Sequence, residues 1–191
     1  QDIVLGASLD NNILCIAEKS VVAMRQIEPQ LVQEMVKVGC VLIENQQDIQ
    51  RLVDLTVLPN GTPNKKFVGK NASVILDAAH IPYNGDPRLI IMRTPKDHPF
   101  AVIEMLMPIL PVVTVDSFDE GLDVCLMLEA GLHHTATMHS LNMERLNRMA
   151  RKMKTSIFVK NGPSYAGLGF SGEGTTTFTI ATPTGESTTS A

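Results

Sequence analysis

The run from Thr135 to Asn161 constrains the fold more than any other part of the sequence. "TATMHS" and "TSIFVKN" are rich in β-branched residues and are typical of strands. Between them, Asn142 is placed to cap "MERLNRMARKMK", whose apolar residues Leu146, Met149 and Met153 share one helical face. Strand, helix and strand at this spacing predict a βαβ unit. We therefore expect an α/β fold with a mostly parallel sheet and helices on both faces, a three-layer αβα arrangement.

More helices are predicted upstream of this unit. Ser117 and Glu120 have the spacing of a capping box, and Gly131 is a suitable stop for the helix that follows them. Pro29 stands at a first helical position of "PQLVQEMVKVGCVLI", which has an apolar face. A further amphipathic helix is predicted over residues 45–57.

Four other segments are predicted to be strands. "SVVAM", "ASVILDAA", "RLIIMRT" and, near the end of the chain, "TTTFTIAT" combine β-branched residues with flanking turn residues. The apolar run from Phe100 to Val115 contains Pro108 and Pro111. Because proline cannot donate to a sheet ladder, we expect two short strands joined by a bend there.

Composition excludes several classes of protein. The 191 residues are 44% hydrophobic and 19% charged, which is typical of one globular domain with its own core. The net charge is −4 and the longest basic cluster is "RMARKMK", so no nucleic-acid partner is expected. No apolar run reaches the roughly 18 residues of a membrane span, and no membrane partner is expected. The start, "QDIVLGASLD", has no signal-peptide pattern, and further sequence is expected upstream.

The three cysteines, Cys15, Cys40 and Cys125, are odd in number and widely spaced, with no C-x-x-C pair. This pattern argues against a disulfide framework and against a thiolate zinc site, and it favours a reducing, cytoplasmic setting. In that setting a solitary cysteine is a catalytic candidate, although free cysteine is also among the most often buried residues.

One glycine motif and three histidines are candidates for ligand sites. "GLGFSG", Gly167 to Gly172, matches G-x-G-x-x-G, but it lacks a preceding strand and a following helix, so a tight loop is preferred to a dinucleotide site. His133, His134 and His139 do not have metal-ligand spacing, and no metal site is predicted. One histidine near an active centre remains an alternative to structural or surface roles.

Two residues leave their roles open when they are considered alone. Glu104 is a carboxylate in the apolar run "FAVIEMLMPILPVV", where it either faces water at a strand end or receives hydrogen bonds from a ligand. Cys15 is either a small buried hydrophobe or a nucleophile. No histidine lies close to it in sequence, so a nucleophilic Cys15 needs backbone N–H groups or a base from elsewhere in the fold.

Several stretches together resemble one family, the CoA-acylating aldehyde dehydrogenases of ethanolamine and propanediol utilisation. "GASLDNNILCIAEKSV" resembles the family's segment around the catalytic cysteine, and "IFVKNGPSYAGLG", "GEGTTTFTIATPTGE" and "TTSA" resemble its C-terminal signature. "EMLMPILPVV" resembles a Glu-x-x-x-Pro segment of the wider superfamily. The departures are mild: Ile13 and Leu14 where Leu-Pro is common, and Ser187 where glycine is common.

The resemblance implies an oxidoreductase that converts acetaldehyde or propionaldehyde, NAD and CoA into acyl-CoA and NADH. Cys15 would form a thiohemiacetal and then an acyl thioester, which the CoA thiol takes over. The resemblance assigns cofactor contacts to Glu104, at the nicotinamide ribose, and to Leu106 and Pro108, at the nicotinamide end.

The resemblance also implies a place for the chain in a larger protein. Residues 1–191 would form a single catalytic domain, with the NAD-binding domain upstream of it. The full protein would be a homo-oligomer in the cytoplasm, either free or inside a bacterial microcompartment. An alternative from another class is that the isolated domain is an inactive module that folds and self-associates without binding a cofactor, through an apolar face left by the other domain.

Overall fold

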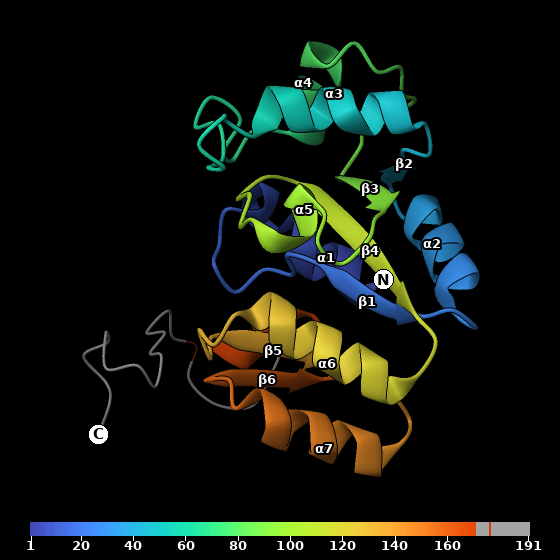
Figure 1. Ribbon diagram of the computed structural model, residues 1–191, viewed down its shortest axis with the longest axis vertical. Helices are drawn as coiled ribbons and strands as arrows, with labels where there is room; N and C mark the ends of the chain where they lie inside the picture. Colours follow the sequence, from blue (N-terminus) through green and yellow to red (C-terminus); the bar gives the residue numbers. More distant parts are fainter. Residues whose placement is uncertain (171–175, 177–191) are drawn as a thin grey trace.

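The computed structural model describes residues 1–170 and 176, and in this part of the chain it contains two parallel sheets (Figure 1). The strands are β1 (Val21–Met24), β2 (Cys40–Leu42), β3 (Leu89–Arg93), β4 (Ile109–Val115), β5 (Thr135–Met138) and β6 (Ile157–Lys160). Four of them pair in the order β1-β4-β3-β2, and β5 pairs with β6; every pairing is parallel. The predicted α/β class with a mostly parallel sheet is confirmed.

Helices precede and follow each strand. They are α1 (Asp2–Ser8), the 3-10 helix η1 (Leu9–Asn12), α2 (Glu28–Lys37), α3 (Gln46–Thr56), α4 (Ala72–Ala78), α5 (Pro99–Val102), α6 (Phe118–Glu129), α7 (Met143–Met153) and the 3-10 helix η2 (Ser164–Leu168). In the part of the chain that the structure describes, no helix is both long and apolar enough to cross a membrane.

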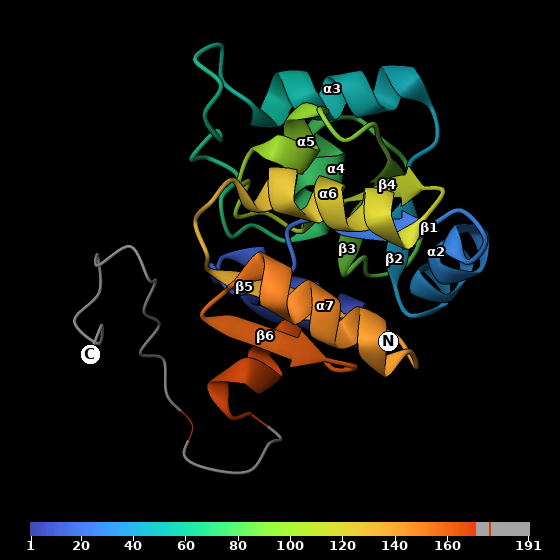
Figure 2. The same cartoon turned by 60° about the horizontal axis from the view of Figure 1, so that its bottom comes forward.

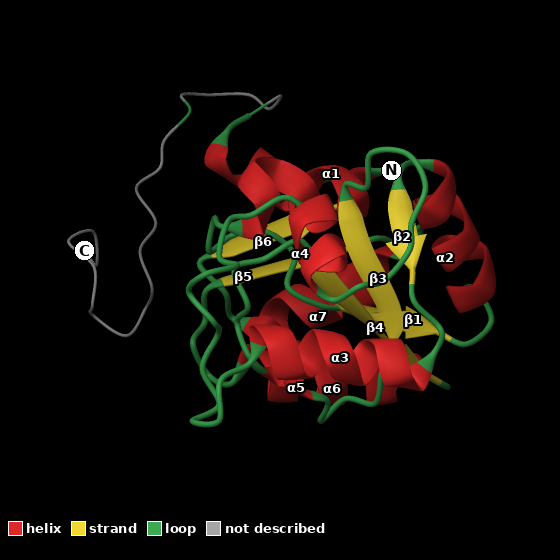
Figure 3. Ribbon diagram, turned by 90° about the horizontal axis from the view of Figure 1, so that it is seen from above, coloured by secondary structure: helices red, strands yellow, loops and turns green. Residues whose placement is uncertain are grey.

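The four-stranded sheet lies between two layers of helices. Alternating residues of β3 point to opposite faces: Ile90 and Met92 pack with α3 and α4, whereas Leu89 and Ile91 pack with α1 and α2. Helix α6 covers the same face as α3, through Val124 against β4. Figure 3 shows α1 on one side of the strands and α3, α5 and α6 on the other. This is the expected three-layer αβα arrangement.

The βαβ unit predicted near the C-terminal end is present. Thr135 pairs with Ile157 in the parallel register of β5 and β6. The side chain of Asn142 caps α7 by accepting a hydrogen bond from the N–H of Arg145 at 3.0 Å. Met149, on α7, lies in an apolar cluster with residues of α6, β5 and β6. Figure 2 shows α7 beside the two strands.

The predicted capping box at the start of α6 is also present. Ser117 accepts a hydrogen bond from the N–H of Glu120 at 3.1 Å, and the Glu120 carboxylate accepts one from the N–H of Asp116 at 2.7 Å. The helix predicted over residues 29–43 is shorter than expected, and α2 ends at Lys37. A glycine with φ of +104° at position 39 follows, and the rest of the run forms β2.

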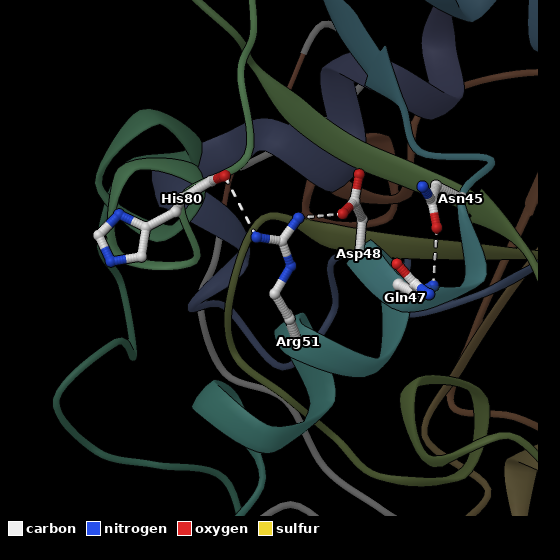
Figure 4. A network of polar contacts seen from close by, with 5 residues as sticks. All are labelled: Asn45, Gln47, Asp48, Arg51 and His80. Atoms are coloured by element: carbon white, nitrogen blue, oxygen red, sulfur yellow. Dashed lines mark hydrogen bonds and ion pairs between the residues drawn. The ribbon is translucent and has the colours of Figure 1, made fainter.

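Helix α3 is fixed at its first turns by polar side chains (Figure 4). Asn45 precedes the helix and accepts a hydrogen bond from the N–H of Gln47 at 2.8 Å. Arg51 forms an ion pair with Asp48 and donates to the carbonyl of His80 at 3.4 Å. These contacts join α3 to the turn that follows α4.

The strand prediction for "ASVILDAA" is wrong, because residues 72–78 form helix α4. The β-branched residues Val74 and Ile75 favoured a strand. However, the buried residues Ala72, Ile75, Leu76 and Ala79 follow the helical spacing i, i+3, i+4 and i+7, which packs one face of α4 into the core. Burial of that face decides the conformation.

The prediction of two strands between Phe100 and Val115 is also wrong. The first part is the short helix α5, and β4 runs through Pro111 without a break. The carbonyl of Val115 accepts from the N–H of Arg25 on the β1 side, and alternation places Pro111 on that same side. The first pair between β1 and β4 is Val21 with Val112, so the hydrogen bonds between these strands begin after Pro111. The sheet therefore loses no hydrogen bond because Pro111 lacks an N–H.

Candidate active site

The candidate residues meet where the parallel strands begin. Cys15 lies between η1 and β1, Glu104 lies between α5 and β4, and His134 directly precedes β5. In Figure 1 the segments entering β1 and β4 lie at the same, left-hand side of the view. Electrostatic interactions connect Lys19 with Cys15 and Glu104, and Glu104 with His134. The fold therefore gathers a thiol, an amine, a carboxylate and an imidazole at one edge.

Cys15 is the accessible cysteine of the three. It is exposed, whereas Cys40 lies in the core and Cys125 packs against the cluster between α6 and α7. Burial raises the pKa of Cys40 to about 12 and that of Cys125 to about 11, so both stay protonated and unreactive near neutral pH. Among the cysteines, only Cys15 is placed to react with a solute.

The loop before Cys15 has an unusual backbone. Asp10, Asn11 and Asn12 have positive φ angles of 48°, 53° and 66°, a left-handed conformation that Asn and Asp tolerate better than other side chains. Asn12 is buried, and its amide donates to the carbonyls of Ala7 and Glu18, both at 2.8 Å. Asn12 thus holds the loop that presents the cysteine in this conformation.

Lys19, which follows Cys15 in the sequence, folds back and binds the loop that precedes the cysteine. Its ammonium group donates to the backbone carbonyl of Asn12, to the side-chain oxygen of Asn12 and to the carbonyl of Leu14, each at 2.8 Å. Burial lowers the pKa of Lys19 from 10.5 to about 8, and nearby negative charges oppose that shift. Nothing in the sequence pattern singled out Lys19.

Glu18 ties the cysteine loop to the C-terminal part of the described chain. Its buried carboxylate accepts hydrogen bonds from the backbone N–H of Ser164 at 2.9 Å and from its hydroxyl at 2.8 Å. Burial raises the pKa of Glu18. A side chain at Gly6 would collide with this carboxylate, since a Cβ there would lie 2.1 Å from Oε2.

The three residues expected at the cofactor lie in one segment but differ in exposure. Glu104 is exposed, Leu106 is half-buried with a φ of +53°, and Pro108 is buried. Glu104 therefore lies on a loop and faces water, as the first of the two alternatives for this carboxylate predicted. The carbonyl of Leu106 accepts from the N–H of Gly69 at 3.0 Å, and that of Pro108 accepts from Ile90 at 2.8 Å.

A second loop connects this segment with the cysteine loop. The side-chain amide of Asn11 donates to the carbonyl of Gly69 at 3.1 Å and to the side chain of Asn71 at 2.8 Å. Since Gly69 also binds the carbonyl of Leu106, residues 69–71 hold the loops of Cys15 and Glu104 in a fixed relation.

His134 is the histidine that comes near the candidate site. Its Nδ1 lies 2.7 Å from the hydroxyl of Thr135, and burial lowers its pKa, which favours the neutral imidazole at neutral pH. His133 instead contacts the carbonyl of Met153 at 3.1 Å. Among residues 1–170 and 176, no group of three or more His, Cys, Asp or Glu side chains could hold a metal ion.

Part of the predicted site falls outside the described residues. The segments "GEGTTTFTIATPTGE" and "TTSA", the predicted strand "TTTFTIAT" and the last two residues of "GLGFSG" belong to residues 171–191, of which only position 176 is described. The first half of that glycine motif ends η2, and Gly169 has a φ of +89°.

Comparison with known proteins relates the whole chain to one group of enzymes. No model of a protein family matches it. A propanal dehydrogenase (CoA-propanoylating) of Citrobacter freundii is 53% identical over 192 residues, and an acetaldehyde dehydrogenase (acetylating) of Salmonella typhimurium is 45% identical over 196 residues. Both matches cover 100% of the chain but only 41% and 42% of these relatives, so the chain spans about two fifths of their length.

Solved structures agree with this relation. A Rhodopseudomonas palustris propionaldehyde dehydrogenase with bound CoA and an acylated cysteine is 45% identical, with a TM-score of 0.93 over 97% of this chain and 42% of its own. An engineered glycolyl-CoA reductase with bound NADP+ has the same identity, TM-score and coverage. A propionaldehyde dehydrogenase from the fucose utilisation microcompartment of Clostridium phytofermentans is 42% identical, with a TM-score of 0.92 and the same coverage. Over its whole length the chain is homologous to one segment of the CoA-acylating aldehyde dehydrogenases, and that segment makes up about two fifths of the length of these enzymes.

Proposed function

We propose that this chain supplies the nucleophile of a CoA-acylating aldehyde dehydrogenase that acts on a short-chain aldehyde, and that Cys15 is that nucleophile. The observation that carries the proposal is the placement of Cys15. It is the exposed cysteine, and it follows a loop that Asn12 and Lys19 fix with five hydrogen bonds of 2.8 Å. Cysteine is the most nucleophilic side chain near neutral pH, and a thioester is a good acyl donor.

The residues at this edge of the sheet can carry out the acyl chemistry. The thiolate of Cys15 adds to the aldehyde carbonyl and gives a thiohemiacetal, whose oxyanion backbone N–H groups beside Cys15 would stabilise. A nicotinamide dinucleotide supplies a hydride acceptor when it is bound. The resulting thioester on Cys15 then passes its acyl group to the thiol of CoA. The neutral imidazole of His134 is a candidate to accept a proton at this edge.

Glu104 fits a contact with the dinucleotide. Its carboxylate is exposed on the loop before β4 and forms no ion pair in the part of the chain that the structure describes, so it is free to accept hydrogen bonds from ribose hydroxyls. Leu106 is assigned to the nicotinamide end from the same loop. Pro108, which is buried directly before β4, is assigned to the same nicotinamide end.

The proposal extends to the protein that carries this chain. Residues 1–191 would form its catalytic domain, with an NAD-binding domain upstream, because the relatives are more than twice as long as the chain. The substrate would be propionaldehyde or acetaldehyde, and the protein a homo-oligomer of the cytoplasm, free or inside a bacterial microcompartment. The structure of the microcompartment enzyme of Clostridium phytofermentans supports the last placement.

The test is an assay of the full polypeptide that contains this chain, with propionaldehyde, NAD+ and CoA. Cys15→Ala should abolish NADH formation, and Cys125→Ser, which replaces the half-buried thiol on α6, should retain it. Acyl-CoA formation by Cys15→Ala at the rate of the parent protein would refute the assignment.

A second proposal concerns the chain in isolation. Since it spans about two fifths of its relatives, we infer that alone it folds without binding NAD and does not turn over an aldehyde. Calorimetric titration of NAD+ into the isolated chain should give no heat of binding. A clear micromolar affinity would contradict this inference.

A further inference from the structure

The partly buried ammonium group of Lys19 has no part in the acyl chemistry described above. All three of its described hydrogen bonds go to oxygens of residues 12 and 14, directly before the nucleophile. A lysine ammonium has three donors, so these bonds use its full capacity. Removing an ammonium charge from water costs free energy, which these hydrogen bonds offset. The three bonds hold residues 12–14 in one backbone conformation.

Lys19 orients the peptide group before Cys15 through the carbonyl of Leu14, which also accepts a hydrogen bond from the N–H of Ala17 at 3.0 Å. In a planar trans peptide the carbonyl oxygen and the N–H point to opposite sides. Because Lys19 binds the carbonyl of Leu14, the N–H of Cys15 points away from the ammonium group. This N–H belongs to the same residue as the thiol. It is a suitable hydrogen-bond donor for an oxyanion on the substrate carbon that is bound to the sulfur.

The charge of Lys19 acts on the same residue. The ionisable groups that interact with it are Cys15, Glu18 and Glu104, on the negative side, and His134. Glu18 is engaged by Ser164, and Glu104 is exposed to solvent. A cation held in a partly desolvated position stabilises a nearby thiolate more strongly than an exposed one would.

We propose that Lys19 is a positioning residue for Cys15: its ammonium group fixes the carbonyls of Asn12 and Leu14 and favours the thiolate form of the cysteine. This inference rests on the proposed function only in naming Cys15 as the nucleophile. It predicts that removal of the positive charge makes Cys15 harder to ionise, whether or not substrates are present.

The test measures alkylation of Cys15 by iodoacetamide between about pH 6 and about pH 10, with peptide mass spectrometry to separate Cys15 from Cys40 and Cys125. Lys19→Met should raise the midpoint of the rate profile by roughly one half to one pH unit, since a nearby charge shifts a pKa by this order. Lys19→Arg keeps the positive charge over this whole range, whereas Lys19, whose pKa burial lowers to about 8, loses its charge within the range, so the midpoint of Lys19→Arg should not lie above that of the parent.

Lys37→Met is the matched control, because Lys37 is exposed on α2 and pairs with Glu34 at 2.7 Å. Its profile should coincide with that of the parent. Circular dichroism verifies that each variant is folded, and if Lys19→Met does not fold, Lys19→Arg decides alone. An unchanged midpoint in folded Lys19→Met, or an upward shift in Lys19→Arg, would overturn the proposal. Alkylation requires no aldehyde, dinucleotide or CoA, so this result is independent of the activity assay.

Discussion

At the scale of single residues, the cysteine loop is held by side chains that lie close to it in sequence and by one that lies far away. Asn12 and Lys19 act within the loop, whereas Ser164 reaches Glu18 across 146 positions of the chain. The resemblance pointed to Cys15 and Glu104. It could not point to Lys19 or Ser164, because periodicity and motif spacing carry no information on a side chain that folds back onto its own loop.

Ser164→Ala tests the distant contact. The variant loses the hydroxyl that donates to the buried Glu18 carboxylate, and we expect a loss of about 1 to 3 kcal/mol in the free energy of unfolding near neutral pH. Urea titration measures this loss.

The same variant has a defined pH dependence. Burial raises the pKa of Glu18 above 4.5, so on acidification the folded state takes up this proton before the unfolded state does. Without the Ser164 hydroxyl that pKa rises further, and the variant gains more from protonation. The loss should therefore shrink as the pH falls through the folded-state pKa. A loss that grows on acidification would contradict this role of Glu18.

At the scale of elements, capped helices could be predicted and burial-driven elements could not. Asn142 and Ser117 mark the starts of α7 and α6 in the sequence, and both caps are present. The sequence pattern predicts a strand where helix α4 forms, because a short apolar run suits either conformation and only its packing against the sheet decides between them. Pro111 lies in a central strand because the neighbouring β1 starts late, and this depends on long-range pairing.

Asn45→Ala tests the cap of α3 (Figure 4). The variant leaves the N–H of Gln47 without its side-chain acceptor, and we expect a loss of about 1 kcal/mol in the free energy of unfolding. Asn45→Asp keeps an acceptor oxygen at the same place and should be close to neutral. Equal losses in both variants would show that the cap hydrogen bond does not contribute.

Two methionines of α7 test the packing of the βαβ unit. Met149 is 7% exposed and faces α6 from α7, whereas Met143 is 61% exposed in the first turn of α7. Met149→Ala should lower the free energy of unfolding by about 2 to 4 kcal/mol, because it leaves a cavity. Met143→Ala should change it by less than about 0.5 kcal/mol. Thermal unfolding of the two variants compares them, and similar shifts in Tm would contradict the assigned burial.

At the scale of the whole molecule, the layers could be predicted but the site's position could not. The βαβ pattern implied a parallel sheet with helices on both faces, and this is present. The order β1-β4-β3-β2, and with it the meeting of the loops before β1 and β4, depends on pairings between distant segments. Ligands of open α/β sheets commonly bind at the carboxyl ends of the strands, whereas the candidate residues here precede the strands.

The central claim is that Cys15 carries the acyl group. The most direct test incubates the full polypeptide with propionyl-CoA in the absence of NAD, so that the thiolate attacks the thioester, the bond from the acyl carbon to CoA breaks, and CoA leaves as the thiol after protonation. Peptide mass spectrometry should find one propionyl group on Cys15 and none in Cys15→Ala, with Cys125→Ser acylated like the parent. A propionyl group on another residue, or its persistence in Cys15→Ala, would contradict the account.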